Sequence, residues 1–168
     1  HVEFFASVRA IAEEKAALLE KLPADGFAVL DLDDAHFDVL RAHASAPVVT
    51  CSLKRRDADY AADPQADGKL WVCERASGEN ATLPLPPPGG FMAENVLRAV
   101  AVARKCGAAW GALETALGHF RPVGMRWAVE DVGGWRAVND GYNANPLSMR
   151  AALKAFAAWP APGRKFLA

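Results

Sequence analysis

Polar side chains are dense in one short segment, Asp140-Gly-Tyr-Asn-Ala-Asn-Pro-Leu-Ser-Met149. The surrounding pattern predicts a strand that ends just before this segment and a helix that begins after Asn145, with Pro146 at its first position. Such strand-to-helix junctions are where α/β sheets bind nucleotides, and the free amides of a helix start attract anions. The segment also has a purely structural interpretation, because Asn and Pro cap helices in general and Asp140 could simply end the strand.

Lys15 is the second candidate, because it lies on an apolar helical stripe. At about 100° per residue, Val8, Ile11, Leu18 and Leu22 share one face, and Lys15 points along the centre of that face. Burying an ammonium group is costly unless the group is paired or neutralised. The simpler interpretation is that the stem packs and the amine reaches water. The alternative is a functional lysine near a ligand or metal, whose amine could react with carbon dioxide to form a metal-binding carbamate.

Asn95 is the third candidate. It lies at the edge of the apolar face of a predicted helix, one turn after Gly89-Gly90, a position more often occupied by a packing residue than by a ligand contact. No Ser-His-Asp or Cys-His arrangement and no G-x-x-x-x-G-K-[ST] phosphate loop is present. None of the four histidines has metal-ligand spacing to another: His1, His36, His43 and His119.

The composition predicts a folded, cytoplasmic protein. The chain has 168 residues, of which 52% are hydrophobic and 23% charged, and this excludes a disordered tail. Nineteen basic against twenty acidic residues give a net charge of −1, so no nucleic-acid or polybasic membrane partner is expected. Three scattered cysteines indicate reduced thiols. No apolar run reaches the length of a membrane span and no signal peptide is recognised. The start at His1 suggests a fragment of a longer protein.

Alternating helix and strand signals predict an α/β sheet with an antiparallel part, and a domain boundary near residues 122–126. Residues 54–68 are charged and predicted to be a loop, whereas Ser77 to Asn80 should form a hairpin turn. Helices are expected over residues 7–22, 37–43, 91–106 and 110–120 and after Asn145. Strands are expected over residues 27–32, 47–52, 69–75, 81–85, 126–132, 135–139 and 164–168.

The same positions make the chain resemble the Mur ligases. The most specific block is Tyr142-Asn-Ala-Asn-Pro-x-Ser-Met149, which is most similar to the members that add D-alanyl-D-alanine rather than alanine, glutamate or diaminopimelate. The resemblance covers nearly the whole chain in scattered blocks. In family order these blocks are His1 to Ser7, Ile11 to Lys15, Gly26 to Asp34, Gly89 to Leu97 and Asp140 to Met149.

This resemblance implies a fold, a reaction and cofactors. Residues 1–123 would be the second half of a P-loop-type central ATP-binding domain with antiparallel hairpins. Residues 124–168 would be the first hairpin and helix of a Rossmann-like C-terminal domain. Family members use ATP and magnesium to convert the carboxylate of a UDP-linked peptide into an acyl phosphate, which an amine then attacks. The expected partners are UDP-N-acetylmuramoyl-tripeptide, D-alanyl-D-alanine and the remainder of the ligase chain, in the cytoplasmic synthesis of peptidoglycan precursors.

The resemblance also implies roles for single residues. His1 would bind magnesium, and Lys15 would be carbamylated and support the metal site. Asn95 would contact the adenine, Arg126 the nucleotide, and Asp140 the ribose hydroxyls, since two hydroxyl donors suit one carboxylate. Four further residues of the polar segment are expected on the substrate or nucleotide side: Tyr142, Asn143, Asn145 and Ser148.

Some positions depart from the family pattern. Phe91-Met92 replaces the usual His-Asn, Met125 stands where Gly is usual, Gly141 where Ser is common, and Asp31 where Asn is common. The phosphate loop, the catalytic glutamate and the UDP-binding domain of the family would all precede His1, so these 168 residues alone are expected not to catalyse ligation. Two alternatives remain: a non-catalytic Mur-like module that binds a nucleotide or a partner, and another amide ligase such as a folylpolyglutamate synthase or cyanophycin synthetase.

Overall fold

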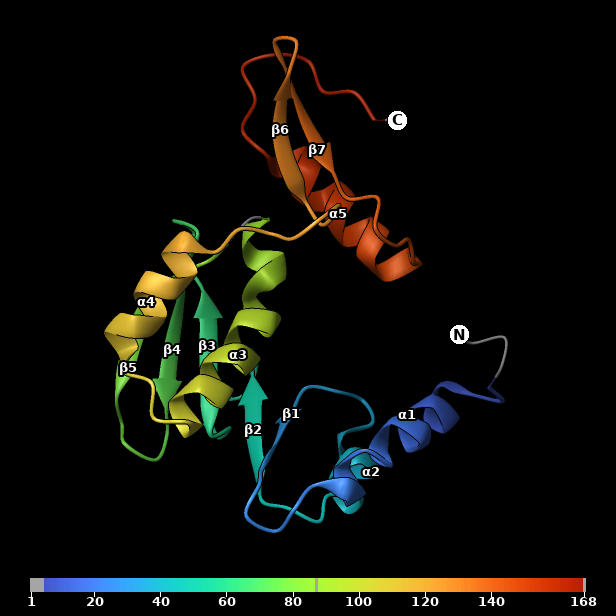
Figure 1. Cartoon of the computed structure of the whole chain (residues 1–168), viewed down its shortest axis with the longest axis vertical. Helices are drawn as coiled ribbons and strands as arrows, with labels where there is room; N and C mark the ends of the chain where they lie inside the picture. Colours follow the sequence, from blue (N-terminus) through green and yellow to red (C-terminus); the bar gives the residue numbers. More distant parts are fainter. Residues whose placement is uncertain (1–4, 87, 168) are drawn as a thin grey trace.

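The computed structural model describes residues 5–86 and 88–167, which form a five-stranded sheet with helices and, further along the chain, a hairpin with one helix (Figure 1). The helical segments are α1 (Val8–Ala16), η2 (Leu19–Lys21), α2 (Phe37–Ala42), η3 (Gly89–Met92), α3 (Ala93–Lys105), α4 (Trp110–His119) and α5 (Pro146–Ala158). The strands are β1 (Ala28–Asp31), β2 (Val48–Ser52), β3 (Tyr60–Pro64), β4 (Lys69–Glu74), β5 (Asn80–Pro84), β6 (Ala128–Val132) and β7 (Trp135–Asn139). This confirms the predicted α/β fold.

The large sheet is mixed, in the order β1-β2-β3-β4-β5. β1, β2 and β3 are parallel neighbours, whereas β3, β4 and β5 pair antiparallel. Helices α3 and α4 cover the same face, because residues of both pack into one core cluster with the central strands. The fully buried side chains of this core include Leu70, Val72, Leu83, Leu97 and Val100. The amphipathic pattern of α3 thus places its N-terminal turn, with Asn95, at one end of the sheet.

Strand β3 corrects the predicted loop over residues 54–68. Its sequence, Tyr-Ala-Ala-Asp-Pro, is alanine-rich, and alanine has a low strand preference. Pairing on both sides decides its conformation: the Asp59 carboxylate accepts hydrogen bonds from the Thr50 amide (2.8 Å) and hydroxyl (2.7 Å), and the Asp59 amide donates to that hydroxyl (2.9 Å). These contacts fix the start of β3 beside β2, and its three buried residues lie in the core of the sheet.

The helix predicted over residues 7–22 is shorter, and its buried face is different. Ser7 caps it as predicted, because its hydroxyl accepts from the Ala10 amide at 3.1 Å. The regular helix ends at Ala16, so an angle extrapolated to Leu18 and Leu22 does not apply. The buried residues are Ala12 and Ala16, and α1 lies against α2. Of the apolar stripe, Ile11 and Leu22 are only partly buried and Val8 is exposed, so the stripe is not the buried face of the helix. Leu18 is 74% exposed and Lys15 is exposed.

After residue 127 the chain forms a separate two-stranded sheet, which is followed by one helix. β6 and β7 form the predicted antiparallel hairpin, with Val129 opposite Val138, and α5 follows. A segment without helix or strand, residues 120–127 and here called the extended segment, links α4 to this hairpin (Figure 1). The strand predicted over residues 164–168 is not formed in its described part, residues 164–167. The longest helices have 13 residues, and no helix of the described residues could cross a membrane.

Candidate functional site

A cavity of about 340 Å³, here called the junction cavity, lies where four segments meet: the η3–α3 start, the extended segment, the loop after β7 and the start of α5. Its volume falls in the range of small-molecule sites, roughly 300–1,000 Å³. Seven of the predicted site residues line it: Asn95, Arg126, Asp140, Tyr142, Asn143, Asn145 and Ser148. The structure therefore brings together residues up to 53 positions apart in sequence, the interval between Asn95 and Ser148.

Asp140 is held in place by the backbone of the extended segment. Strand β7 ends at Asn139, whose side-chain oxygen accepts from the Gly141 amide at 3.1 Å and so turns the chain. The Asp140 Oδ1 atom then accepts a hydrogen bond from the Trp127 amide at 3.0 Å. Trp127 has a φ of 51°, the only positive value at a non-glycine residue of the described chain. The unusual backbone of Trp127 thus orients a carboxylate on the cavity wall.

Arg126 and Tyr142 lie stacked on one another in the same wall. The guanidinium carbon of Arg126 is 3.8 Å from the centre of the Tyr142 ring, a distance that favours a cation–π interaction. Across the cavity, Asn95 is exposed on the first turn of α3. Its Oδ1 atom is 3.5 Å from a guanidinium nitrogen of Arg98, so the amide keeps hydrogen-bonding capacity for a ligand.

Asn145 and Ser148 make the helix cap that the sequence predicts. The Asn145 Oδ1 atom accepts from the amides of Leu147 (3.0 Å) and Ser148 (2.9 Å), while the Ser148 hydroxyl accepts from the Asn145 amide (3.2 Å). This reciprocal pair is a capping box. These two side chains line the cavity, and their hydrogen bonds stabilise the start of α5.

The rest of the cavity wall is apolar, and the sequence reasoning missed it. Met92, Phe120, Pro122, Val123 and Trp127 contribute to the lining. Met92 stands where the family usually has Asn, so this part of the wall offers an apolar surface. Trp127 could have been suspected, as a large aromatic next to Arg126. Its left-handed backbone carries no sequence signal, because Gly and Asn are the residues that usually adopt it.

Of the two predicted metal residues, the structure describes only Lys15, which does not line this cavity. Lys15 is on the exposed side of α1, and His1 lies outside the described residues. Among residues 5–86 and 88–167, no three His, Cys, Asp or Glu side chains are grouped so that they could hold a metal ion.

A partly buried ion-pair network fixes α4, whose end leads into the cavity wall. The Arg104 guanidinium donates to Glu74 (2.6 Å) and to Glu79 (2.7 Å), and stacks at 4.5 Å on the Trp110 ring of α4. Burial alone would raise the pKa of Glu74. The hydrogen bonds from Tyr60 and Arg104 outweigh burial and hold that pKa below its usual range. Burial and the bond to Glu74 also raise the pKa of the Tyr60 hydroxyl.

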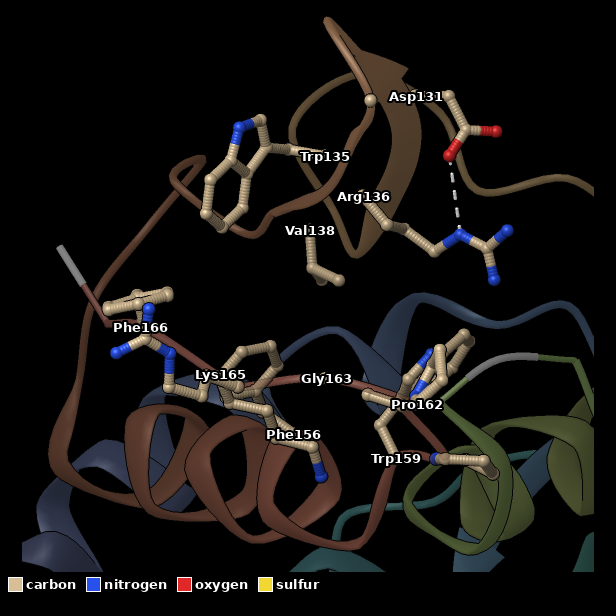
Figure 2. A pocket seen from close by; sticks show the side chains of 14 residues that line it. Asp131, Trp135, Arg136, Val138, Phe156, Trp159, Pro162, Gly163, Lys165 and Phe166 are labelled. Carbon is tan, nitrogen blue, oxygen red and sulfur yellow. Dashed lines mark hydrogen bonds and ion pairs between the residues drawn. The ribbon is translucent and has the colours of Figure 1, made fainter.

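A second cavity, of about 600 Å³, lies between the β6–β7 hairpin, α5 and residues 159–166. Figure 2 shows Trp135 and Val138 on one side and Phe156 on the other. Two of its cations are already engaged: Arg136 pairs with Asp131 at 3.3 Å, and the Lys165 amine donates to the Ala157 carbonyl at 2.7 Å. It contains none of the predicted site residues, so the smaller junction cavity is the better candidate.

Comparisons with known proteins identify the family of this chain. Residues 1–103 match the Mur ligase middle domain. The chain belongs to the Mur ligase family.

Its relatives include two kinds of ligase. It is 35% identical over 168 residues to the UDP-N-acetylmuramate–L-alanine ligase of Bordetella avium, covering 89% of this chain and 36% of that protein. It is 32% identical over 176 residues to the UDP-N-acetylmuramoyl-tripeptide–D-alanyl-D-alanine ligase of Mycobacterium tuberculosis H37Rv, covering 94% of this chain and 32% of that protein. The chain thus spans about a third of the length of these relatives.

Solved structures show the same fold. MurF from Acinetobacter baumannii aligns with a TM-score of 0.80 at 20% identity, over 93% of this chain and 34% of that one. MurF from Thermotoga maritima, solved in complex with ADP, aligns with a TM-score of 0.72 at 20% identity, over 94% of this chain and 36% of that one. The α/β architecture is therefore that of the Mur ligases.

Proposed function

We propose that this chain is the nucleotide-binding junction of an ATP-dependent ligase that forms amide bonds in cytoplasmic peptidoglycan precursor synthesis. One observation carries the proposal: Asn95, Arg126 and Asp140, each expected from the resemblance to touch the nucleotide, come from three separate segments and line one cavity. The T. maritima relative in fold, solved with ADP, gives the same class of ligand.

The chemistry of each residue suits one part of an adenosine nucleotide. A carboxylate accepts hydrogen bonds from two hydroxyls, so Asp140 would hold the ribose. A guanidinium suits phosphate oxygens, so Arg126 would bind the phosphate chain. A side-chain amide both donates and accepts, so Asn95 would pair with the adenine edge. Bound ATP would supply the phosphoryl group that activates a carboxylate.

We further propose that the amine added is D-alanyl-D-alanine and that the acceptor is UDP-N-acetylmuramoyl-tripeptide. The Tyr142–Met149 block and the M. tuberculosis relative support this choice. The B. avium relative supports a competing choice, in which L-alanine is joined to UDP-N-acetylmuramate. The proposed magnesium site rests on the resemblance alone, since it depends on His1 and on carbamylation of an exposed Lys15.

Nucleotide binding can be tested directly with this chain. Titration with ADP, followed by calorimetry or by tryptophan fluorescence, to which Trp127 of the cavity wall contributes, should show saturable binding and give a Kd. Replacing Asp140 by Ala removes the proposed ribose acceptor, and we expect the Kd for ADP to rise about tenfold or more. Asp131→Asn, on the same hairpin but in the other cavity, is the matched control and should leave the Kd unchanged. Unchanged ADP binding in D140A, or no binding by the original chain, would contradict the proposal.

Testing the choice of substrates requires a longer polypeptide that also contains the phosphate loop. In such a protein, ATP-dependent phosphate release should require UDP-N-acetylmuramoyl-tripeptide and rise on addition of D-alanyl-D-alanine. If phosphate is released with UDP-N-acetylmuramate and L-alanine instead, the protein would be an L-alanine ligase. Nucleotide binding without release on either pair would favour the non-catalytic module.

A further inference from the structure

The extended segment and the loop after β7 are joined by backbone contacts on both sides of Arg126. The Tyr142 amide donates to the Met125 carbonyl at 3.0 Å, and the Trp127 amide donates to the Asp140 carboxylate at 3.0 Å. Arg126 lies between these two bonds, and its guanidinium stacks on the Tyr142 ring. Residues 125–127 and 140–142 therefore form one paired unit, with the Arg126–Tyr142 stack at its centre.

The stack supplies what a phosphate-binding arginine needs. An arginine side chain has several rotatable bonds, and fixing it on a ligand costs conformational entropy. A guanidinium that lies on a ring has already lost part of this freedom, while the N–H donors at its edge remain free for an anion. Within the described part of the chain, no carboxylate pairs with Arg126. Its charge is thus available to a ligand in the junction cavity.

We propose that Tyr142 is a positioning residue for Arg126, and that it favours nucleotides with phosphate groups over the bare nucleoside. Arg126 occupies one face of the ring, and the proposed role of Tyr142 is to hold that guanidinium for the phosphate groups. This inference rests on the proposed nucleotide site and adds to it the residue that sets preference for the phosphate chain.

The test compares two ligands and two variants. Tyr142→Leu removes the ring, and Tyr142→Phe keeps it. We expect Y142L to raise the Kd for ADP about fivefold to tenfold, and to leave the Kd for adenosine within about twofold. Y142F should bind both ligands as the original chain does. In an Arg126→Met background, Y142L should have little further effect on ADP binding, because the two residues act together.

Controls separate folding from binding. Tyr142 is 59% exposed, so both variants should fold, and their thermal unfolding checks this. Trp135→Leu removes a similarly exposed aromatic from the neighbouring hairpin, outside the junction cavity, and should not change either Kd. If Y142L binds ADP normally, or weakens adenosine as much as ADP, the positioning role is overturned while the nucleotide site stands. If the original chain binds neither ligand, both proposals fail.

Discussion

The carboxylate of Asp140 serves the structure and the proposed ligand at once. Its Oδ1 atom is bonded to the Trp127 amide, and a carboxylate has capacity for further donors. Asp31, at the end of β1, likewise uses one carboxylate for two contacts. Standing where the family commonly has Asn, it accepts from the Asp33 amide at 2.9 Å and pairs with Arg98 of α3 at 2.5 Å. Its negative charge thus ties β1 to the helix that carries Asn95.

Glu74 provides a prediction at the residue scale. Its pKa is held below the usual range in the folded state, so the unfolded state binds the proton more tightly and stability rises with pH. This contribution is fully present above the ordinary glutamate pKa and is lost as the pH falls through the lower, folded value. We expect Glu74→Gln to lower the free energy of unfolding by about 2 kcal/mol at neutral pH, and by much less at about pH 3.

Urea unfolding at both pH values measures this difference. Glu130→Gln, at an exposed position of β6, is the control and should change stability little at either pH. An equal loss for E74Q at both pH values would show that the charge of Glu74 does not contribute.

At the scale of elements, the helices beside the cavity are placed by local contacts at their ends. α5 begins with the Asn145–Ser148 capping box and Pro146 at its first position. α4 is held by the Arg104 guanidinium, which stacks on Trp110 and also donates to the Ala108 carbonyl at 3.0 Å. Because Phe120 directly follows α4 and lines the junction cavity, this ion-pair network also sets one wall of the proposed site.

The cap of α5 provides a prediction at this scale. Asn145→Ala removes the acceptor of two amides, and we expect it to destabilise α5 by about 1 kcal/mol. Asn145→Asp keeps the acceptor and places a negative charge at the helix start, which is favourable, so it should be at least as stable as the original. Hydrogen exchange of the α5 amides measures both. Equal exchange in N145A and N145D would contradict a role for the cap.

For the whole molecule, burial is distributed unevenly. The core cluster belongs to the five-stranded sheet with α3. Among the described residues after position 123, Trp127 alone is a buried hydrophobic residue. Leu147 is 82% and Val132 57% exposed, and a two-stranded hairpin has little stability of its own. We therefore expect β6, β7 and α5, here called the hairpin unit, to be the least stable part of the described chain.

This distribution predicts the order of opening. Amides of β6, β7 and α5 should exchange with solvent at least about tenfold faster than those of β2, β3 and α3. Because the junction cavity is lined by both parts, saturating ADP should slow exchange in the hairpin unit more than in the sheet. Uniform protection along the chain, or no slowing by ADP, would contradict this description.

The sequence by itself determined the elements with strong local signals. These are the hairpin around Ser77 to Asn80, the capped helix after Asn145, and the polar segment with Asp140. Family membership could also be predicted, because short blocks of residues keep their order along the chain. The cap and the turn are local, since their partners lie within a few residues.

Only the tertiary structure decided the rest. β3 forms because β2 and β4 pair with an alanine-rich segment, and α1 buries Ala12 and Ala16 while Lys15 is exposed. The left-handed backbone of Trp127 and the Arg126–Tyr142 stack depend on contacts between residues 125–127 and 140–142. Such contacts are non-local, and their energies exceed the weak local preferences from which a single sequence is interpreted.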